Sequence, residues 1–334
     1  VQGDDVYQDG ESYAVSVVDT GEHNFEQLDS SDTATVTVTD TVDTTTLTLG
    51  DVTVAEGSGT ATIGATLSQP TDREFTVTLS NGATITFAAN SATATSTAFA
   101  VQGDDVYQDG ESYAVSVVDA GEHNFEQLDS SDTATVTVTD TVDTTTLTLG
   151  DVTVAEGSGT ATIGATLSQP TDREFTVTLS NGATITFAAN SAVGTSTAFA
   201  VQGDDVYQDG ESYTVSVVDA GEHNFEQLDS SDTATVTVTD TVDTTTLTLG
   251  DVTVAEGSGT ATIGATLSQP TDREFTVTLS NGATITFAAN SAVGTSTAFA
   301  VQGDDVYQDG ESYAVSVVDT GEHNFEQLDS SNTA

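Results

Sequence analysis

Apolar and polar residues alternate along most of the chain, most clearly in one stretch that begins at Thr133 and recurs at Thr33 and Thr233. Residues 133–139 alternate Thr with Val or Ala, and residues 147–154 alternate Leu or Val with Thr or Asp. A period of two residues predicts half-buried strands. The four residues 140–143 between them are too few and too poor in glycine for a comfortable hairpin. We therefore expect a taut hinge there, at which one domain ends and the next begins.

The same pattern predicts seven or eight strands and no helix between residues 142 and 241. The expected strands cover 147–154 with a break at Gly150, 161–167, 175–179, 183–187, 199–201, 213–217 and 233–239. Asn181-Gly182 predicts a hairpin with a type I′ turn, in which both central residues have positive φ. Residues 190–196 are small and polar and are expected to form a loop or crossover, and residues 203–211 an acidic turn. In the mixed segment 219–232, Phe225 and Leu228 are expected to plug the edge of the core.

Short strands and regular turns over about 100 residues are typical of a β-sandwich. The apolar phase of the strands predicts its core. The expected core residues are Leu149, Val154, Ile163, Leu167, Phe175, Val177, Ile185, Phe187, Phe199, Tyr213, Val215, Val217 and Val238.

The sequence repeats with a period of 100 residues, since the segment that starts at Val1 returns almost unchanged at Val101, Val201 and Val301. A unit of this size can bury its own core, unlike the shorter repeats of solenoids. Because the alternation stops and restarts at the hinge rather than at Val1, we expect domains to run from hinge to hinge. Residues 1–41 are then the C-terminal part of an Ig-like repeat, 42–141 and 142–241 are complete repeats, and 242–334 is a repeat that lacks its last strand. Together they predict a linear array.

The chain carries 53 acidic residues against 3 Lys and Arg, a formal net charge of −50. This charge excludes nucleic acid and anionic membrane surfaces as natural partners and favours cations. Most of the acids are expected to form a solvated, self-repelling surface.

Cys and Met are absent. Without cysteine there is no disulfide framework and no thiolate metal site. Without an initiator Met, the segment is expected to be internal to a longer protein. No apolar run of about 18 residues and no leader pattern occurs, so no direct membrane insertion is expected.

Several motifs resemble two known families of extracellular modules. Val154-Ala-Glu-Gly, Val201-Gln-Gly-Asp-Asp-Val-Tyr-Gln-Asp-Gly-Glu and the Thr-Val-Thr-Asp that ends at Asp240 resemble the Calx-β module, a calcium-binding sandwich. The hinge Thr139-Asp-Thr-Val-Asp-Thr-Thr-Thr-Leu, Val177-Thr-Leu-Ser-Asn-Gly and Asn224-Phe-Glu-Gln-Leu are similar to the Ig-like extender repeats of giant biofilm (RTX) adhesins that bacteria export by type I secretion. The second resemblance covers the whole chain.

The Calx-β resemblance implies Ca²⁺ as the cofactor, bound at one tip of each repeat. In the middle repeat it implies the ligands Glu156, Asp204, Asp205, Asp209 and Asp240, and Asp243 beyond the hinge could add an oxygen. The corresponding residues of the other copies are Asp4, Asp5, Asp9, Asp40, Asp43, Glu56, Asp104, Asp105, Asp109, Asp140, Asp143, Glu256, Asp304, Asp305 and Asp309. Hard cations prefer six to eight oxygen ligands, which several strand ends could supply together.

Two features of the motifs leave alternatives open. The Gly-Thr-Ala…Asp-Tyr segment of typical Calx-β modules is missing, so the number of ions stays open. Ordinary polar turns are the alternative for Asp204-Asp205 and Asp209-Gly210, because Asp and Gly favour turns by themselves. Glu211 is expected to cap the acidic turn rather than bind metal.

The sequence does not favour an enzyme. His123 lies in Gly-Glu-His-Asn-Phe with no partnered Ser nucleophile, and a lone loop His is typical of a surface residue. The adhesin resemblance implies a calcium-stabilised spacer at the bacterial cell surface that projects a distal adhesive domain. Its expected partners are the neighbouring repeats, end to end, and no small-molecule substrate is expected. The alternative is an array that binds ice, glycan or another surface through Thr-rich strands, although exposed Thr is also a good strand former.

Overall fold

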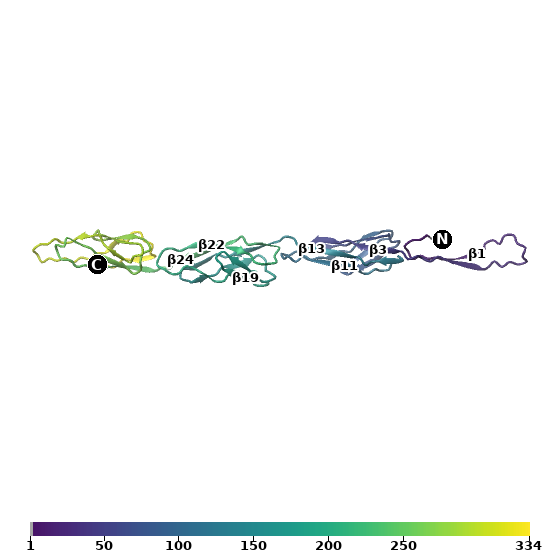
Figure 1. Cartoon of the computed structure of the whole chain (residues 1–334), viewed down its shortest axis with the longest axis horizontal. Helices are drawn as coiled ribbons and strands as arrows, with labels where there is room; N and C mark the ends of the chain where they lie inside the picture. Colours follow the sequence, from purple (N-terminus) through teal and green to yellow (C-terminus); the bar gives the residue numbers. More distant parts are fainter. Residues whose placement is uncertain (1–2) are drawn as a thin grey trace. The chain divides into compact units, whose positions relative to one another are not determined.

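The computed structural model describes residues 3–334, and all regular secondary structure in this part of the chain is β-strand (Figure 1). The predicted all-β fold of tandem sandwiches is therefore confirmed. The chain divides into two compact units, the first reaching Thr144 and including Asn224–Gln227, and the second comprising Thr145–His223 and Leu228–Ala334. None of the described residues forms a helix long and apolar enough to cross a membrane.

Residues 3–41 contain β1 (Ser12–Ser16) and β2 (Thr33–Thr37). The strands of residues 42–141 are β3 (Thr44–Leu49), β4 (Val52–Ala55), β5 (Thr60–Ala61), β6 (Gly64–Leu67), β7 (Phe75–Leu79), β8 (Thr84–Phe87), β9 (Thr93–Thr95), β10 (Phe99–Ala100), β11 (Ser112–Asp119), β12 (Gln127–Asp129) and β13 (Thr133–Thr139).

The next two copies repeat this order. The strands of residues 142–241 are β14 (Thr144–Leu149), β15 (Val152–Ala155), β16 (Thr160–Ala161), β17 (Gly164–Leu167), β18 (Phe175–Leu179), β19 (Thr184–Phe187), β20 (Val193–Thr195), β21 (Phe199–Ala200), β22 (Ser212–Asp219), β23 (Gln227–Asp229) and β24 (Thr233–Thr239). Those of residues 242–334 are β25 (Thr244–Leu249), β26 (Thr260–Ala261), β27 (Gly264–Leu267), β28 (Phe275–Leu279), β29 (Thr284–Phe287), β30 (Val293–Thr295), β31 (Phe299–Ala300), β32 (Val317–Asp319) and β33 (Gln327–Asp329).

Two sheets enclose the core of residues 42–141. One has the strand order β4-β13-β11-β7-β8, the other has the order β12-β3-β6-β9, and the short pair β5–β10 lies apart from both. β3 and β4 are adjacent in sequence but belong to different sheets, because the chain breaks at Gly50 and crosses the sandwich. β13 then pairs in parallel with β4 and antiparallel with β11. The last strand of the repeat is therefore an inner strand of the larger sheet.

The core follows the period-2 pattern, with some departures. Ten of the thirteen predicted core residues of the middle repeat are buried, including Phe199 with 9% exposed, but Val154, Tyr213 and Val217 are only half-buried. Val154 lies on β15, the outer strand of its sheet, so one side of it has no neighbouring strand. Alternation gives the face on which a residue lies, but not the place of its strand in the sheet. Fully buried residues outside the predicted set include Leu147, Leu179 and Val236.

Two predicted segments differ in the structure. The expected strand 161–167 is split into β16 and β17, because the backbone N–H of Ile163 donates to Ser196 Oγ (2.9 Å) at the point where the chain changes sheets. The expected loop 190–196 contains β20, which pairs antiparallel with β17 through small residues such as Gly194. The small residues of this segment are therefore compatible with a closely paired strand as well as with a loop.

The hairpin at Asn181-Gly182 forms, but its predicted type I′ turn is wrong. Only Gly182 has positive φ (83°), and its N–H donates to the carbonyl of Leu179 (2.9 Å). The N–H of Leu179 in turn donates to the carbonyl of Ala183 (2.8 Å). These bonds are typical of a three-residue hairpin with one left-handed glycine. Because this φ is positive, any residue with a side chain at position 182 would strain the turn.

His123 is half-buried against the aromatic core, which corrects its interpretation as a surface residue. Its ring lies edge-on to Phe75, with 6.1 Å between ring centroids, and 5.8 Å from Phe125. Phe125 is fully buried, so the expected edge plug is part of the core itself. Burial, followed by the charge of Arg73, lowers the pKa of His123, and burial likewise lowers the pKa of His323.

The buried phenylalanines of β8, β19 and β29 supply the first prediction. Replacing Phe87, Phe187 and Phe287 by Ala should lower the free energy of unfolding by about 3 to 5 kcal/mol per repeat, because each ring is fully buried and leaves a cavity. Denaturant melts of the full chain measure this. The control is Val42, Val142 and Val242 changed to Ala, since these side chains are 75 to 79% exposed. A loss below about 1 kcal/mol per repeat in the Phe variant would contradict the assigned core.

The histidines supply a pH prediction. Because the folded pKa of His123 and His323 lies below the ordinary value of 6.5, the stability that the neutral rings contribute is present above about pH 6.5 and is lost as the pH falls through the folded pKa. Changing both residues to Gln should reduce the drop in melting temperature between about pH 7 and pH 5. The exposed His23, changed to Gln, is the control. An identical pH profile for the double variant and the control would refute the prediction.

Candidate metal site at the ends of the repeats

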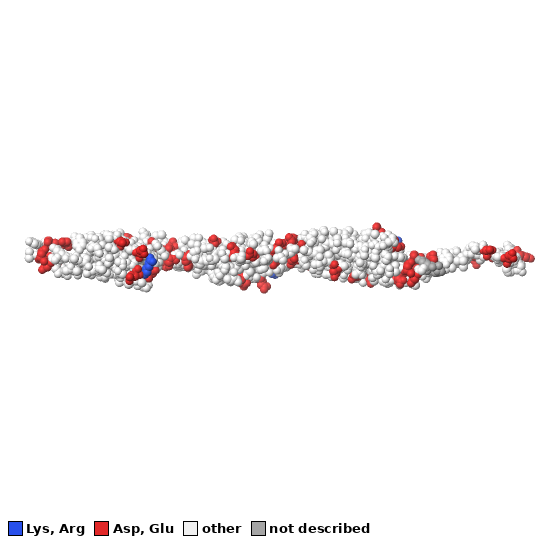
Figure 2. Space-filling view, turned by 90° about the horizontal axis from the view of Figure 1, so that it is seen from above, with Lys and Arg blue, Asp and Glu red and all other residues white. Residues whose placement is uncertain are grey.

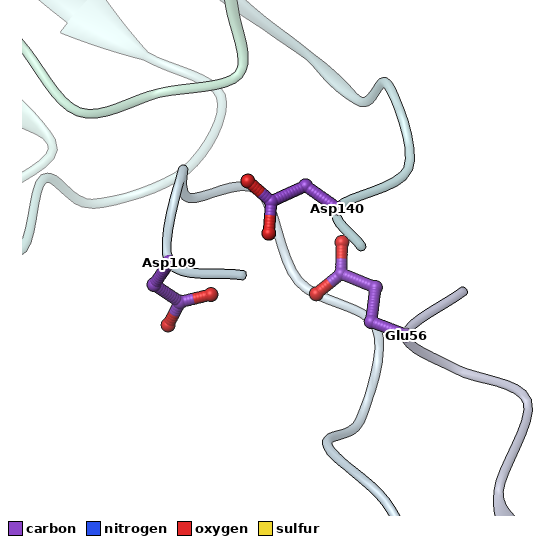
Figure 3. A group of neighbouring side chains, drawn as sticks. All are labelled: Glu56, Asp109 and Asp140. Carbon is purple, nitrogen blue, oxygen red and sulfur yellow. The ribbon is translucent and has the colours of Figure 1, made fainter. Parts of the chain in front are cut away.

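Three chain segments bring carboxylates together at one end of residues 42–141. β4 and β13 run parallel, with Ala55 opposite Thr139, so both strands end at the same edge of the sheet. Glu56 directly follows the first strand, and Asp140 directly follows the second. Asp109 comes from the acidic loop that precedes β11. One carboxylate oxygen of each of the three residues lies within 4.8 Å of the others, and Figure 3 shows the three side chains pointing toward one another.

Glu56 is almost completely buried, with 3% of its surface exposed. Its Oε1 accepts a hydrogen bond from the backbone N–H of Thr141 (3.0 Å), whereas its Oε2 is buried with no hydrogen-bond partner. Asp140 Oδ1 is buried without a partner as well. The copies Glu156 and Asp240 repeat both orphaned oxygens. Buried carboxylate oxygens without donors are costly unless a proton or a cation compensates them.

Two glycines leave the space in which these carboxylates lie. A Cβ built on Gly110 would lie 2.9 Å from Asp140 Oδ1, and a Cβ on Gly57 would lie 2.8 Å from the Cβ of Asp104. Gly57 also has a positive φ of 70°, which L-residues with side chains rarely adopt. Glycine at these two positions therefore lets the acidic side chains approach closely.

The predicted ligands of the middle repeat fall into two overlapping groups. Glu156 lies within 4.8 Å, oxygen to oxygen, of Asp205 and Asp209, and a second group joins Glu156, Asp240 and Glu326. Asp204 lies outside both groups, and its Oδ1 accepts from the Thr241 hydroxyl (2.7 Å). Asp205 also accepts from the N–H of Tyr207 (2.8 Å), as an acid that shapes a turn does. The turn and metal interpretations of this residue are thus compatible.

The other copies show the same arrangement in part. In residues 3–41, a pocket of about 170 Å³ is lined by Asp4, Asp5, Asp9, Asp40 and also Glu126. Asp104 accepts from the Thr141 hydroxyl (2.8 Å), and Asp105 accepts from the N–H of Tyr107 (2.8 Å). In residues 242–334, Glu256, Asp305 and Asp309 form a group but are all exposed. Asp304 lies against Gly257, where a Cβ on the glycine would meet its Cβ at 2.7 Å.

The hinge aspartates Asp43, Asp143 and Asp243 contact the acidic groups through their backbone N–H. The N–H of Asp43 donates to Glu126 (2.6 Å), that of Asp143 to Glu226 (2.5 Å) and that of Asp243 to Glu326 (2.5 Å). None of these three aspartate side chains belongs to the carboxylate groups found among the described residues. Their amides hold a glutamate of the same repeat in place.

Glu126, Glu226 and Glu326 are the site residues that the sequence interpretation missed. They lie in Phe-Glu-Gln-Leu, 14 residues or more from any predicted ligand, and no local spacing ties them to the site. The buried Phe immediately before each one was the available signal, since it fixes the segment against the core. Burial raises the pKa of the Glu326 carboxyl, and the neighbouring Glu156 carboxylate adds to this effect, while the Asp243 amide opposes it. Repulsion between two close carboxylates explains that addition.

An aromatic contact accompanies these carboxylates. In the second compact unit, the ring of Tyr207 stacks on Phe325 with 5.9 Å between centroids, and the Tyr207 hydroxyl donates to the carbonyl of Pro270 (2.7 Å). Tyr207 and Phe325 also form an antiparallel bridge. In the first unit, Tyr7 stacks on Phe125 at the same centroid distance and its hydroxyl donates to the carbonyl of Pro70 (2.6 Å). Consecutive repeats inside each unit therefore join through an apolar contact next to the acidic groups.

The surface charge is concentrated rather than uniform. Figure 2 shows carboxylates gathered in bands, with neutral stretches between them and few basic atoms. The neutral stretches match the strands, whose exposed positions are mainly Thr and Ser, as in β13 and β24. Like charges are thus confined mostly to loops at the ends of the sheets, where their separation is shorter than the Debye length of about 8 Å at physiological salt.

Comparison with solved structures gives distant similarities. The crystal structure of a tetra-tandem repeat in the extending region of a large adhesion protein is 17% identical, with 84% of this chain and 72% of that chain covered and a TM-score of 0.35. The crystal structures of CBD12 from CALX1.2 and of the calcium-binding domain CBD12 of CALX1.1 are 14% and 15% identical, each with a TM-score of 0.25. They cover 52% and 51% of this chain and 79% of each of those chains. A search of curated proteins found no match.

Comparison with protein families gives a match along nearly the whole length. The LapA domain matches residues 1–41, 43–141, 143–241 and 243–334. These four segments leave only single residues of the chain unmatched between them. The chain therefore belongs to the LapA domain family.

Proposed function

We propose that this chain is a non-enzymatic, calcium-stabilised extender region of a large bacterial surface adhesin, which holds a distal adhesive domain away from the cell. Membership of the LapA domain family supports an adhesin repeat, and near-identical copies in tandem suit a spacer better than a series of distinct binding pockets. The domain frame 1–41, 42–141, 142–241 and 242–334 is part of the proposal.

The observation that carries the calcium proposal is the orphaned oxygens of Glu156 and Asp240. Both are buried, both lack hydrogen-bond donors, and they belong to one group with Glu326. Three carboxylates this close repel one another strongly in a partly desolvated site. A divalent cation would replace the repulsion by coordination. The cost of burial is then offset only when the ion is bound.

The donor set favours calcium among common cations. All the candidate ligands are carboxylate oxygens, whereas zinc is bound mainly by nitrogen and sulfur. They come from Glu156, Asp205, Asp209, Asp240 and Glu326. Ca²⁺ accepts many oxygen ligands in irregular geometry, whereas Mg²⁺ requires a near-ideal octahedron. Extracellular calcium modules bind at about 10⁻⁴ to 10⁻³ M, so the ion would be bound outside the cell and released in the cytosol.

Glu326 would let the ion link two consecutive repeats. It belongs to the repeat after that of Glu156 and Asp240, and the Asp243 amide at the hinge holds it. An ion shared by these carboxylates would connect two consecutive repeats across the hinge. The joint would stiffen outside the cell, whereas without the ion the carboxylates would push the repeats apart. Such a chain could be exported slack and become a rigid spacer on the surface.

A pair of charge-matched variants tests this function. Changing Glu226 and Glu326 to Gln should raise the melting temperature in chelator, because the repulsion with Glu56 and Glu156 is removed while the amide oxygen can still accept from the hinge N–H. In about 1 mM calcium the same variant should gain several degrees less than the wild type, because it has lost a ligand. Calorimetry with calcium and with chelator measures both effects.

The control changes Glu222 and Glu322, which are exposed in the same loops, to Gln. It should behave as the wild type does under both conditions. Small-angle scattering gives a second measurement, since calcium should increase the maximum dimension of the wild-type chain. If neither melting temperature nor maximum dimension of the wild type responds to calcium, the acids are only a solvated coat and the calcium proposal is wrong.

A further inference from the structure

The first and the last segment of residues 42–141 run side by side in the same direction. β12 pairs in parallel with β3, and β13 pairs in parallel with β4. Between these two pairings both segments cross from one sheet of the sandwich to the other. We call the pairing of residues 43–56 with residues 126–141 the parallel seam. It joins the segment through which the chain enters the repeat to the segment through which it leaves.

Two aspartates, Asp51 and Asp132, bridge the seam where both segments change sheets. The N–H of Leu49 donates to Asp132 Oδ2 (2.8 Å), and the N–H of Thr135 donates to Asp51 Oδ1 (2.7 Å). The partners of these bonds are 83 and 84 residues apart in the chain, as are those of the two neighbouring ladders. Each carboxylate therefore takes the place of a ladder carbonyl. Both bridging aspartates lie outside the carboxylate groups found among the described residues.

Two glutamates continue the seam beyond its strands. At the entry, the N–H of Asp43 donates to Glu126 (2.6 Å). At the exit, the N–H of Thr141 donates to Glu56 Oε1 (3.0 Å). The two segments are thus hydrogen-bonded to each other from one hinge to the next.

The other copies show what the bridging position requires. In residues 142–241, β15 pairs in parallel with β24, and the N–H of Leu149 donates to Asp232 Oδ2 (2.8 Å). The N–H of Leu249 donates instead to Asn332 Oδ1 (3.0 Å). An amide oxygen accepts this bond as a carboxylate oxygen does. The position therefore requires an acceptor and not a negative charge.

The direction of the seam decides how the repeat responds to tension. A pull along the chain acts on residue 43 at the start of one segment and on residue 141 at the end of the other, in opposite directions. Because the segments are parallel, these residues lie at opposite ends of the pairing. The load then runs along the strands and is shared by all the hydrogen bonds between them. A pair of strands that is loaded from one end would instead lose its bonds one at a time.

Both segments are also held on their other side. β13 lies between β4 and β11, and β3 lies between β12 and β6, so each segment must break two ladders in order to slide. In addition, Ala134, Val136 and Val138 of β13 are buried in the core and would have to leave it.

We propose that the parallel seam is a shear clamp, through which each repeat carries tension along the chain without unfolding, and that Asp51 and Asp132 are positioning residues of this clamp. That tension acts on the chain rests on the proposed spacer function, because a spacer transmits the force on its distal domain to the cell. The resistance of the fold itself rests neither on that function nor on calcium, since the bridging aspartates are not candidate ligands.

Force spectroscopy of the full chain in two pulling directions tests the clamp, and the absence of native cysteine allows thiol handles at chosen residues. Val42→Cys with Val142→Cys places the handles just outside the seam, at side chains that are 75 and 78% exposed. Glu74→Cys with Ala88→Cys places them at the open end of the β7–β8 hairpin, where the load opens one bond at a time. At equal force and in chelator, the first pair should hold at least about tenfold longer than the second. Unfolding of the whole repeat is identified by an extension of roughly 300 Å.

Variants with the first pair of handles test the bridging aspartates. Asp132→Ala leaves the N–H of Leu49 without its acceptor and should shorten the lifetime under force about tenfold, because unfolding speeds up as the bond is lost. Asp132→Asn keeps an acceptor, as Asn332 does, and should hold as long as the wild type. The control is Ser80→Ala, which removes a side-chain acceptor from the N–H of Ser116 (3.2 Å) outside the seam. It should lower the melting temperature but leave the lifetime under force unchanged.

The outcomes separate the clamp from its positioning residues. Equal lifetimes for the two pairs of handles would overturn the shear clamp, and this comparison leaves both bridging aspartates in place. If Asp132→Ala shortens the lifetime no more than Ser80→Ala does, or if Asp132→Asn fails as early as Asp132→Ala, the role of the bridging aspartates is wrong. A failure of the calcium proposal would leave these results unchanged, because all lifetimes are compared in chelator.

Discussion

The structure depends above all on the strand that completes each sandwich, Thr133–Thr139 in the first complete repeat. This strand places three buried side chains in the core, supplies backbone partners to two neighbouring strands and ends directly before Asp140. It pairs in parallel with β4, so Glu56 and Asp140 follow two strands that end at the same edge of the sheet. The acidic site is thus a consequence of completing the sheet.

Charge and burial make opposite demands, and the repeat separates them in space. Like charges facing one another across strands are destabilising, and the strands accordingly carry Thr, Ser, Val and Ala. Nearly all acids must then lie in loops, and loops gather at the ends of a sandwich. The ends consequently hold both the strongest repulsion and the oxygens that a hard cation requires. A high net negative charge keeps such a chain soluble while a cation could still order its joints.

Two different interactions meet at each joint. The stack of Tyr207 on Phe325, with the hydroxyl bonded to Pro270, is apolar and independent of ions. The carboxylate of Glu326 lies beside Glu156 and opposes the joint unless its charge is compensated. The aromatic contact fixes which surfaces meet, and in the proposed function a bound cation would strengthen this contact by compensating the carboxylates. A spacer with such joints could respond to its surroundings without unfolding its sandwiches.

The sequence by itself determined the all-β class, the repetition and most of the buried face, because alternation with period two is a local property of a strand. Its resemblance to Calx-β modules also pointed to Glu156, Asp209 and Asp240, each of which lies in a carboxylate group of the structure. Only the tertiary structure decided which strands are neighbours: it placed Val154 on an outer strand, split the strand at Ile163 between two sheets, and gave the hairpin at Gly182 one left-handed residue instead of two. It alone brought Glu326 to Glu156, 170 residues away in the chain. Such pairings are set by long-range packing and by the joint between repeats, and no local pattern of residues records them.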